Sequence, residues 1–502
     1  MQFVTNLRGG ISYLWIAVVF ALLLSGLSTA LSQGSSPAPS PRFSTAEARM
    51  HYNKATVLGE KAEWGGAVLE LNRALQNEPN HPELLIELGI ALGELEEWDQ
   101  AIRILKKAVE LAPDSVRAHY NLGVTLDRFN PGKKPGTSEY QKALKLNPED
   151  VGSLINLAAN LGDQNSDEAR KLLERALAID PKNPRAHFNL ALLLKNSGDG
   201  SGAVEELHKA IGLDPEPLEP RRHLVSLLVS EQRWDETVVQ CQEILKRKST
   251  DWSARYTLGQ SLIRRSKVAE GRKELEKSQE IRQSQEKKEE VEKIVHQGVD
   301  ALTQGKVEEG IKQFTSALKM DQSSSQAHMY LGVALAAAGR PDQGIEELKK
   351  AIELDPSSPR AHHNLGTVLM QTGRMDLARQ ELEKALRLDP YFPETHNNLG
   401  LILSRDNQAP QGIEHFRLAS DLNPHYLEAL FNLGLALRSI HQIDAAIQAF
   451  RRAAEAAPDN PEVHYALSMT LKDKGDLKGA KEAMDRATTL QQQSGAKPHS
   501  RR

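Results

Sequence analysis

A 34-residue period runs through long stretches of this 502-residue chain and constrains its fold more than any other feature. At this spacing a leucine returns, followed by glycine or another small residue. The glycines at this place are Gly89, Gly123, Gly298, Gly332, Gly366, Gly400 and Gly434, and all but Gly298, which follows Gln297, come after a leucine. A period of this length is typical of a solenoid, in which each unit packs on its neighbours. The sequence therefore predicts a repeat protein that acts through its surface.

Each period predicts two short helices and a stop, as residues 359–390 show. Two apolar stripes have helical spacing, one through Leu365, Gly366 and Leu369 and one through Ala378, Leu382 and Ala385. The small residues remove bulk where the helices cross, so that the helix axes can approach to roughly 8–10 Å. Asp376 is placed to cap the second helix, and Pro390 cannot continue it.

The order of small residue, alanine, bulky apolar residue, alanine and proline resembles the tetratricopeptide (TPR) repeat. The resemblance covers nearly all of the chain from Ser44 onward and gives about thirteen repeats. They close at Pro79, Pro113, Pro148, Pro181, Pro215, Ser249, Gln283, Gln322, Pro356, Pro390, Pro424, Pro458 and Gln492. The resemblance implies an all-α fold, a right-handed superhelical α-solenoid of helix-turn-helix repeats.

An irregular step divides the predicted repeats into a first block over residues 44–283 and a second over 284–492. From Gly259 to Gly298 the step is 39 residues, and the charged segment from Arg272 to Lys293 contains no glycine or proline. Five extra residues turn a helix by about 140° beyond a full turn. We expect a long helix here. It either joins two blocks whose inner faces point differently, or is a solvated helix that leaves their direction unchanged.

Two repeats depart locally from the pattern. Residues 130–136 should replace the usual tight turn with a longer loop. In the sixth repeat, Val225, Thr237 and Cys241 stand where glycine, alanine and a bulky apolar residue are expected. Cys241 is the only cysteine, which excludes internal disulfides, and its place in the repeat predicts a buried apolar role.

The N-terminus predicts export from the cytoplasm. Arg8 precedes an apolar segment from Ile11 to Leu24, and the small residues up to Ala30 suit a cleaved signal peptide over residues 1–30. The alternative is an uncleaved anchor, because residues 11–31 just reach the roughly 20 residues that span a bilayer. Residues 31–43 form a Ser/Pro-rich linker, and 493–502 a disordered basic tail. We expect the repeats in a secreted or periplasmic location, or membrane-anchored outside the cytoplasm.

Composition and motifs argue against nucleic-acid binding and catalysis. The net charge is −4, and lysine and arginine are spread through the repeats. The chain has no phosphate-binding glycine loop, no Gly-x-Ser-x-Gly elbow, no His-Glu-x-x-His pair and no cysteine cluster. We therefore expect no enzymatic activity, no cofactor and no metal, with membrane contact only through an uncleaved N-terminal segment.

Histidines recur three residues before the repeating leucine, at His119, His187, His328, His362, His396 and His464. Equivalent residues of neighbouring repeats should lie about 8–10 Å apart, as packed helices do, whereas zinc ligands lie at about 2.0–2.1 Å from one ion. These histidines therefore cannot share a metal. We expect them to be partly buried, in a slot where the TPR family often has a larger aromatic residue.

Asparagines form a second column, each directly before the leucine of its repeat: Asn121, Asn156, Asn189, Asn364, Asn398 and Asn432. They should point outward, about 150° around the first helix from its apolar stripe. Similarity to the TPR arm of O-linked N-acetylglucosamine transferase, here without a catalytic domain, implies that they line an inner groove and bind peptide backbone. The alternative is that their amides bond to adjacent repeats or to water.

The extra asparagine of carboxylate-clamp TPR proteins, two residues after the leucine, is absent. Its places hold Ile90, Val124, Leu192, Val333, Thr367, Leu401 and Leu435. A receptor for chaperone tails is therefore disfavoured. We expect a non-enzymatic scaffold that binds protein or peptide segments in its groove, as an assembly or adaptor factor outside the cytoplasm. The alternative function is the substrate-recognition subunit of a separate enzyme, such as a glycosyltransferase.

Overall fold

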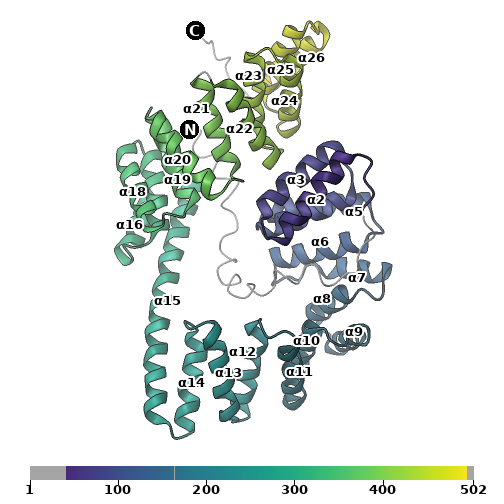
Figure 1. Cartoon of the computed structure of the whole chain (residues 1–502), viewed down its shortest axis with the longest axis vertical. Coiled ribbons are helices and arrows are strands. Elements are labelled where there is room, and N and C mark those ends of the chain that lie inside the picture. The colour runs from purple at the N-terminus through teal and green to yellow at the C-terminus, as the bar shows by residue number, and fades with distance from the viewer. Residues whose placement is uncertain (1–40, 163, 407, 494–502) are drawn as a thin grey trace. The chain divides into compact units, whose positions relative to one another are not determined.

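All regular secondary structure is helical over the residues that the computed structural model describes, 41–162, 164–406 and 408–493 (Figure 1). These ranges form 25 α-helices and no strand, which confirms the predicted all-α fold. Among these helices none is both long and apolar enough to cross a bilayer. The predicted signal peptide, most of the linker and most of the tail lie outside the described residues.

The described chain divides into two compact units. Unit 1 contains Glu47–Asn77 and the chain from Ile294 onward, and unit 2 contains Glu78–Lys293. The helices assigned to unit 2 are α4 (Pro82–Glu94), α5 (Trp98–Leu111), α6 (Val116–Phe129), α7 (Thr137–Leu146), α8 (Val151–Leu161), α9 (Ser166–Ile179), α10 (Pro184–Asn196), α11 (Gly200–Leu213), α12 (Leu218–Ser230), α13 (Trp234–Arg247) and α14 (Trp252–Arg264).

Unit 1 begins with α2 (Ala46–Glu60) and α3 (Trp64–Asn77) and resumes after the long helix α15 (Val268–Thr303), which runs across the boundary. Its other helices are α16 (Val307–Met320), α17 (Ser325–Ala337), α18 (Pro341–Leu354), α19 (Pro359–Gln371), α20 (Met375–Leu388), α21 (Pro393–Arg405), α22 (Ala409–Leu422), α23 (Leu427–Ser439), α24 (Ile443–Ala456), α25 (Pro461–Lys474) and α26 (Leu477–Gln493).

The helices pair as hairpins, and the close approach predicted for small residues is present. A Cβ added to Gly366 on α19 would lie 2.7 Å from Leu382 Cγ on α20, so the crossing tolerates only glycine without adjustment. Ala378, Leu382 and Ala385 on α20 are fully buried, as the second stripe predicts. The turn between the two helices passes through Gly373, whose φ of +75° favours glycine.

The predicted long helix is present as α15, whose 36 residues are unbroken from Val268 to Thr303. Its first part packs on α14, where an added Cβ at Gly259 would meet Leu275 Cγ at 2.8 Å. Its last part packs on α16, where an added Cβ at Gly298 would meet Phe314 Cε1 at 2.5 Å. The helix therefore serves two successive hairpins, and the helices together make about thirteen of them, as the resemblance implies.

The expected long loop and buried cysteine are also found. The chain runs without helix from the end of α6 at Phe129 to the start of α7 at Thr137. Asp127 Oδ1 accepts a hydrogen bond from the Gly136 amide at 2.7 Å and so closes this loop. Cys241 on α13 is fully buried among apolar side chains.

The predicted cap of the second helix was wrong. Helix α20 is preceded by Arg374, which makes no side-chain cap, and Asp376 lies inside the first turn. There its carboxylate faces the positive end of the helix dipole without capping an amide. In this hairpin the side-chain cap is at the first helix, where Ser358 Oγ accepts from the Ala361 amide at 3.3 Å. The residue before α20 is Arg374, whose side chain has no acceptor, whereas Asp199 in the same place before α11 accepts from the Gly202 amide at 2.9 Å.

Candidate peptide-binding groove

First helices of successive repeats contact one another directly, as α17 does α19 and α21 does α23. In a curved stack of hairpins, the helices that meet across repeats line the inner face. The asparagine column lies on these first helices. In unit 1 we call the face of α17, α19, α21, α23 and α25 that carries this column the inner groove.

In unit 1 the column consists of Asn364 on α19, Asn398 on α21 and Asn432 on α23, all half-buried. Asn398 Nδ2 donates to Thr367 Oγ1 at 3.0 Å, and Asn432 Nδ2 donates to Asn397 Oδ1 at 2.9 Å. Both bonds reach back to the first helix of the preceding repeat. The Asn364 side chain has no hydrogen-bond partner within the described ranges, so its amide is available to a ligand.

In unit 2 the asparagine amides bond mostly to their own helices. Asn121 is 5% exposed and Asn189 half-buried, and each donates to the carbonyl one turn earlier, of Arg117 at 2.8 Å and of Arg185 at 2.9 Å. Asn156 Oδ1 accepts from Arg185 at 2.7 Å, across to the next repeat. Only the Asn156 contact is of the kind that the alternative expects, a bond to an adjacent repeat, and peptide binding by the column stays a prediction.

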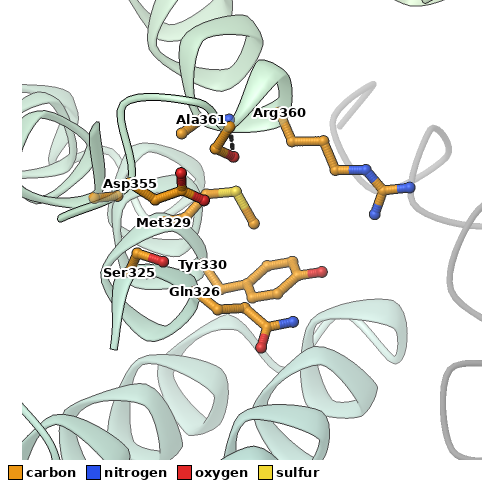
Figure 2. A pocket seen from close by; sticks show the side chains of 9 residues that line it. Ser325, Gln326, Met329, Tyr330, Asp355, Arg360 and Ala361 are labelled. Atoms are coloured by element: carbon orange, nitrogen blue, oxygen red, sulfur yellow. Dashed lines mark hydrogen bonds between the residues drawn. The ribbon is translucent and has the colours of Figure 1, made fainter. Parts of the chain in front are cut away.

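A cavity of about 210 Å³ opens beside α17 and α19, at the end of the column where Tyr330 takes the place of asparagine (Figure 2). Figure 2 shows Tyr330 and Gln326 next to each other, Met329 between them and Asp355, and the Arg360 guanidinium extending away from the other side chains. Arg360 makes no ion pair with any described residue. Two features of the sequence could have indicated this cavity, the absence of asparagine at position 330 and an arginine in the first turn of α19.

Apolar side chains are exposed farther along the same face. Leu435 on α23 is 42% exposed and Tyr465 on α25 is 53% exposed. Leu401 and Phe431 lie half-buried and pack against the core beneath. The column two residues after the leucine therefore has an exposed apolar member at Leu435. Val333 in the same column is buried and packs within the solenoid.

Charges are ordered along the first helices of the last repeats. Their first turns carry Glu394, Glu428 and Glu462, and their last turns carry Arg405, Arg438, Lys472 and Lys474. Acidic groups at helix N-termini and basic groups at C-termini match the helix dipole. At the basic ends, however, Arg438 is paired with Asp473 at 2.6 Å and Lys474 with Asp444 at 2.7 Å.

The histidine column is structural. His119 Nδ1 lies 2.7 Å from Glu139 Oε2, and its Nε2 lies 3.1 Å from the Pro113 carbonyl oxygen. His187, His328 and His362 make the same two contacts with Glu206, Glu347 and Glu381 and with the preceding loops. Each of these rings is thus held between a carboxylate oxygen of the second helix and a carbonyl oxygen of the preceding loop.

The chain supplies a comparison for this interpretation. Arg255 occupies the same place in its repeat, with Nη1 2.5 Å from Glu274 Oε2 and Nη2 2.8 Å from the Ser249 carbonyl oxygen. A permanent cation thus fits the same site. At His396 the carboxylate is replaced by His415, whose Nδ1 lies 2.9 Å from that of His396. Within the described ranges no group of three or more histidine, cysteine, aspartate or glutamate residues could hold a metal ion.

Comparison with known proteins agrees with this architecture. Models described as tetratricopeptide repeat match residues 296–359 and 397–461 and, for a second model, 160–228, 335–397 and 437–499. A third, described as TPR repeat, matches residues 91–127. The chain carries tetratricopeptide repeats. The fold resemblance drawn from the residue pattern is therefore confirmed by TPR models that match in both units.

Individual relatives are distant. A peroxisomal targeting signal receptor of Candida glabrata is 39% identical over 75 residues, which are 15% of this chain and only 13% of that receptor. Among solved structures, YrrB, a TPR protein with an unusual peptide-binding site, is 25% identical over 36% of this chain and 92% of its own, with a TM-score of 0.32. Cut9–Hcn1 of the APC/C is 18% identical over 89% of this chain and 94% of its own, with a TM-score of 0.37. Pseudomonas aeruginosa PilF is 23% identical over 42% of this chain and 95% of its own, with a TM-score of 0.38.

Proposed function

We propose that the chain is a non-enzymatic scaffold whose inner groove in unit 1 binds an extended peptide segment of a partner protein. The observation that carries the proposal is the unpaired Asn364 amide between the Tyr330 cavity and the exposed Leu435 and Tyr465. An amide both donates and accepts, so it pairs with peptide N–H and C=O groups whatever the side chains. The cavity and the apolar residues would then take two side chains of the segment.

Asn398 and Asn432 fit this proposal as supporting residues. Each donates its Nδ2 hydrogens to the preceding repeat, which leaves Oδ1 as an acceptor for a peptide N–H. The bond also fixes the direction of the side chain before the ligand arrives, which lowers the entropy lost on binding. Asn121, Asn156 and Asn189 are proposed for the same role in unit 2, where an incoming peptide would replace bonds to helix carbonyls and Arg185.

We further propose that this scaffold works as an assembly or adaptor factor outside the cytoplasm, secreted or periplasmic after signal cleavage or held by residues 11–31. Support comes from the apolar N-terminal segment followed by small residues and a Ser/Pro-rich linker. Determining the first residue of the mature chain and the compartment that contains it tests this. A mature chain that keeps residues 1–30 and stays in the cytoplasm would contradict it.

The second candidate is the substrate-recognition subunit of a separate enzyme such as a glycosyltransferase. The asparagine column favours it, through the resemblance to the TPR arm of O-linked N-acetylglucosamine transferase. Co-purification with a catalytic chain, and transfer activity that depends on the groove asparagines, would distinguish it from a scaffold.

The groove is tested by titrating the mature chain into peptides selected from an unbiased library, with fluorescence anisotropy as the readout. One peptide hydrogen bond contributes about 0.5–1.5 kcal/mol, so Asn364→Ala should weaken binding roughly 2- to 12-fold. Asn147→Ala, in the loop after α7, is the matched control and should leave the affinity unchanged. Equal affinities for native and Asn364→Ala protein, or no selected peptide at all, would refute the groove.

A further inference from the structure

Helix α3 is buried far more than the second helix of a single hairpin should be. Eight of its 14 residues are buried: Gly66, Ala67, Val68, Leu69, Glu70, Leu71, Asn72 and Ala74. In α20, a second helix of the same length, only Ala378, Leu382 and Ala385 are buried. A residue such as Asn72, 7% exposed, is not part of the hairpin stripe, so another element covers α3.

The covering element is α22, about 350 residues away in the sequence. Asn72 Nδ2 donates to the carbonyl oxygens of Asp421 at 3.0 Å and Leu422 at 3.3 Å. Asp421 receives two more donors, with Arg73 Nε at 3.2 Å from Oδ2 and Gln76 Nε2 at 3.0 Å from Oδ1. The Asp421 carboxylate and the last carbonyls of α22 are thus satisfied by three side chains of α3.

Tyr391, in the loop before α21, fits against the start of α3. An added Cβ at Gly66 would lie 2.8 Å from Tyr391 Oη, and one at Gly65 would lie 2.8 Å from Tyr391 Cβ. Glycine is unfavourable in a helix, so two of them in the first turn need a reason. The tyrosine occupies the space that two side chains would need.

Other repeats of unit 1 show what the same edge looks like uncovered. The last residue of the second helix is 45% exposed at Leu354 on α18 and 44% exposed at Leu388 on α20. The equivalent Leu422 on α22 is 8% exposed. The covering is therefore specific to α22, where the tyrosine precedes the repeat and the aspartate ends it.

We propose that α22 and Tyr391 form a docking site for a helix, separate from the inner groove, and that α3 of the same chain occupies it as a clasp. The site selects a helix with glycine at the second and third positions of its first turn and with amide and guanidinium donors two turns later. Release of the α2–α3 hairpin uncovers Leu422 and the Asp421 carboxylate. The clasp thereby controls whether this edge of the C-terminal repeats is open to a partner helix of the same kind.

The test compares Gly66→Ala in the native chain and in a Tyr391→Ala background, with hydrogen exchange of the α3 amides as the readout. In the native chain the new methyl group collides with the tyrosine, so α3 should exchange at least 10-fold faster. In the Tyr391→Ala background the collision is gone, and the helix preference of alanine should slow exchange about 4- to 5-fold. Gly212→Ala on α11, with no atom within 4 Å of the added Cβ, is the control and should slow local exchange in both backgrounds.

The same sign of effect for Gly66→Ala in both backgrounds would overturn the clasp. Asn72→Ala provides an independent variant, because it removes the hydrogen bonds to the Asp421 and Leu422 carbonyl groups without changing the first turn of α3. It should speed exchange in α3 while α24 keeps its native protection, and unchanged exchange in α3 would count equally against the proposal. Native α3 protection should be the same at protein concentrations 100-fold apart. Protection lost on dilution would place the helix of a second copy in the site and overturn the intramolecular occupant.

Discussion

The crossing of α19 and α20 offers a direct test of why the repeat needs a glycine. Gly366 faces Leu382, which is fully buried, and an added Cβ would lie 2.7 Å from its Cγ and 2.9 Å from its Cδ2. The next nearest atom is the Ala378 carbonyl oxygen at 3.2 Å. The perturbation is a double-mutant cycle of Gly366→Ala and Leu382→Ala, because removing the leucine removes the two closest atoms.

The expected free energies follow from these contacts. Leu382→Ala leaves a cavity in the hairpin and should destabilise it by about 2–5 kcal/mol. Gly366→Ala overpacks the crossing by about 1–3 kcal/mol and recovers about 1 kcal/mol of helix preference, a net loss of about 0–2 kcal/mol. In the double variant the overpacking disappears. The double variant should therefore be about 1–3 kcal/mol more stable than the sum of the single effects.

Urea unfolding followed by circular dichroism, together with hydrogen exchange of the α19 and α20 amides, measures this coupling. Hydrogen exchange is needed because repeats contribute stability locally and one transition does not describe a long array. Ala337→Gly, at the exposed end of α17, reports helix preference without the crossing. Additivity of the two single effects within about 0.5 kcal/mol would refute the claim that Gly366 is required by Leu382.

Three further predictions concern titration and reactivity. Burial raises the pKa of the Glu347 carboxyl, but hydrogen bonds from Lys350 and His328 outweigh burial and hold the pKa below its ordinary value. The stabilisation by these bonds is therefore present near neutral pH and lost as the pH falls through the lowered pKa. Urea midpoints between pH 7 and 3 should fall less steeply for Glu347→Gln than for the native chain, and parallel curves would contradict this. Burial, with His396 beside it, lowers the pKa of His415 from 6.5 to about 4. Protonation of His415 therefore favours unfolding, and stability should drop as the pH falls from 6.5 towards 4. His415→Glu restores the histidine–glutamate pair of the other repeats and should lessen the drop in exchange protection of α21 and α22, and an unchanged drop would argue against the His396–His415 pair as its source. Burial raises the pKa of Cys241 to about 12, so its thiol should react with a maleimide at pH 8 only as fast as the chain unfolds, and fast labelling of the folded chain would show that the sixth repeat is open.

Much of the candidate groove could be expected from the sequence, because its position depends on the period. Residues with the same place in each repeat share one helix face, and Asn364, Asn398 and Asn432 accordingly lie on the first helices. What the amides bond to could not be expected, since it depends on single residues of the neighbouring repeat. Thr367 and Asn397 supply acceptors to two of them, and nothing within the described ranges supplies one to Asn364.

The sequence by itself determined the hairpin, its glycine crossing and the presence of the long helix α15, because these depend on contacts and spacings within one or two periods. Only the tertiary structure decided that Asp376 is not a cap, that a cavity opens beside Tyr330, and that α3 packs on α22. The last contact joins residues about 350 positions apart. It depends on complementarity between two particular surfaces, such as Tyr391 against Gly65 and Gly66, and no 34-residue period specifies which distant helices meet.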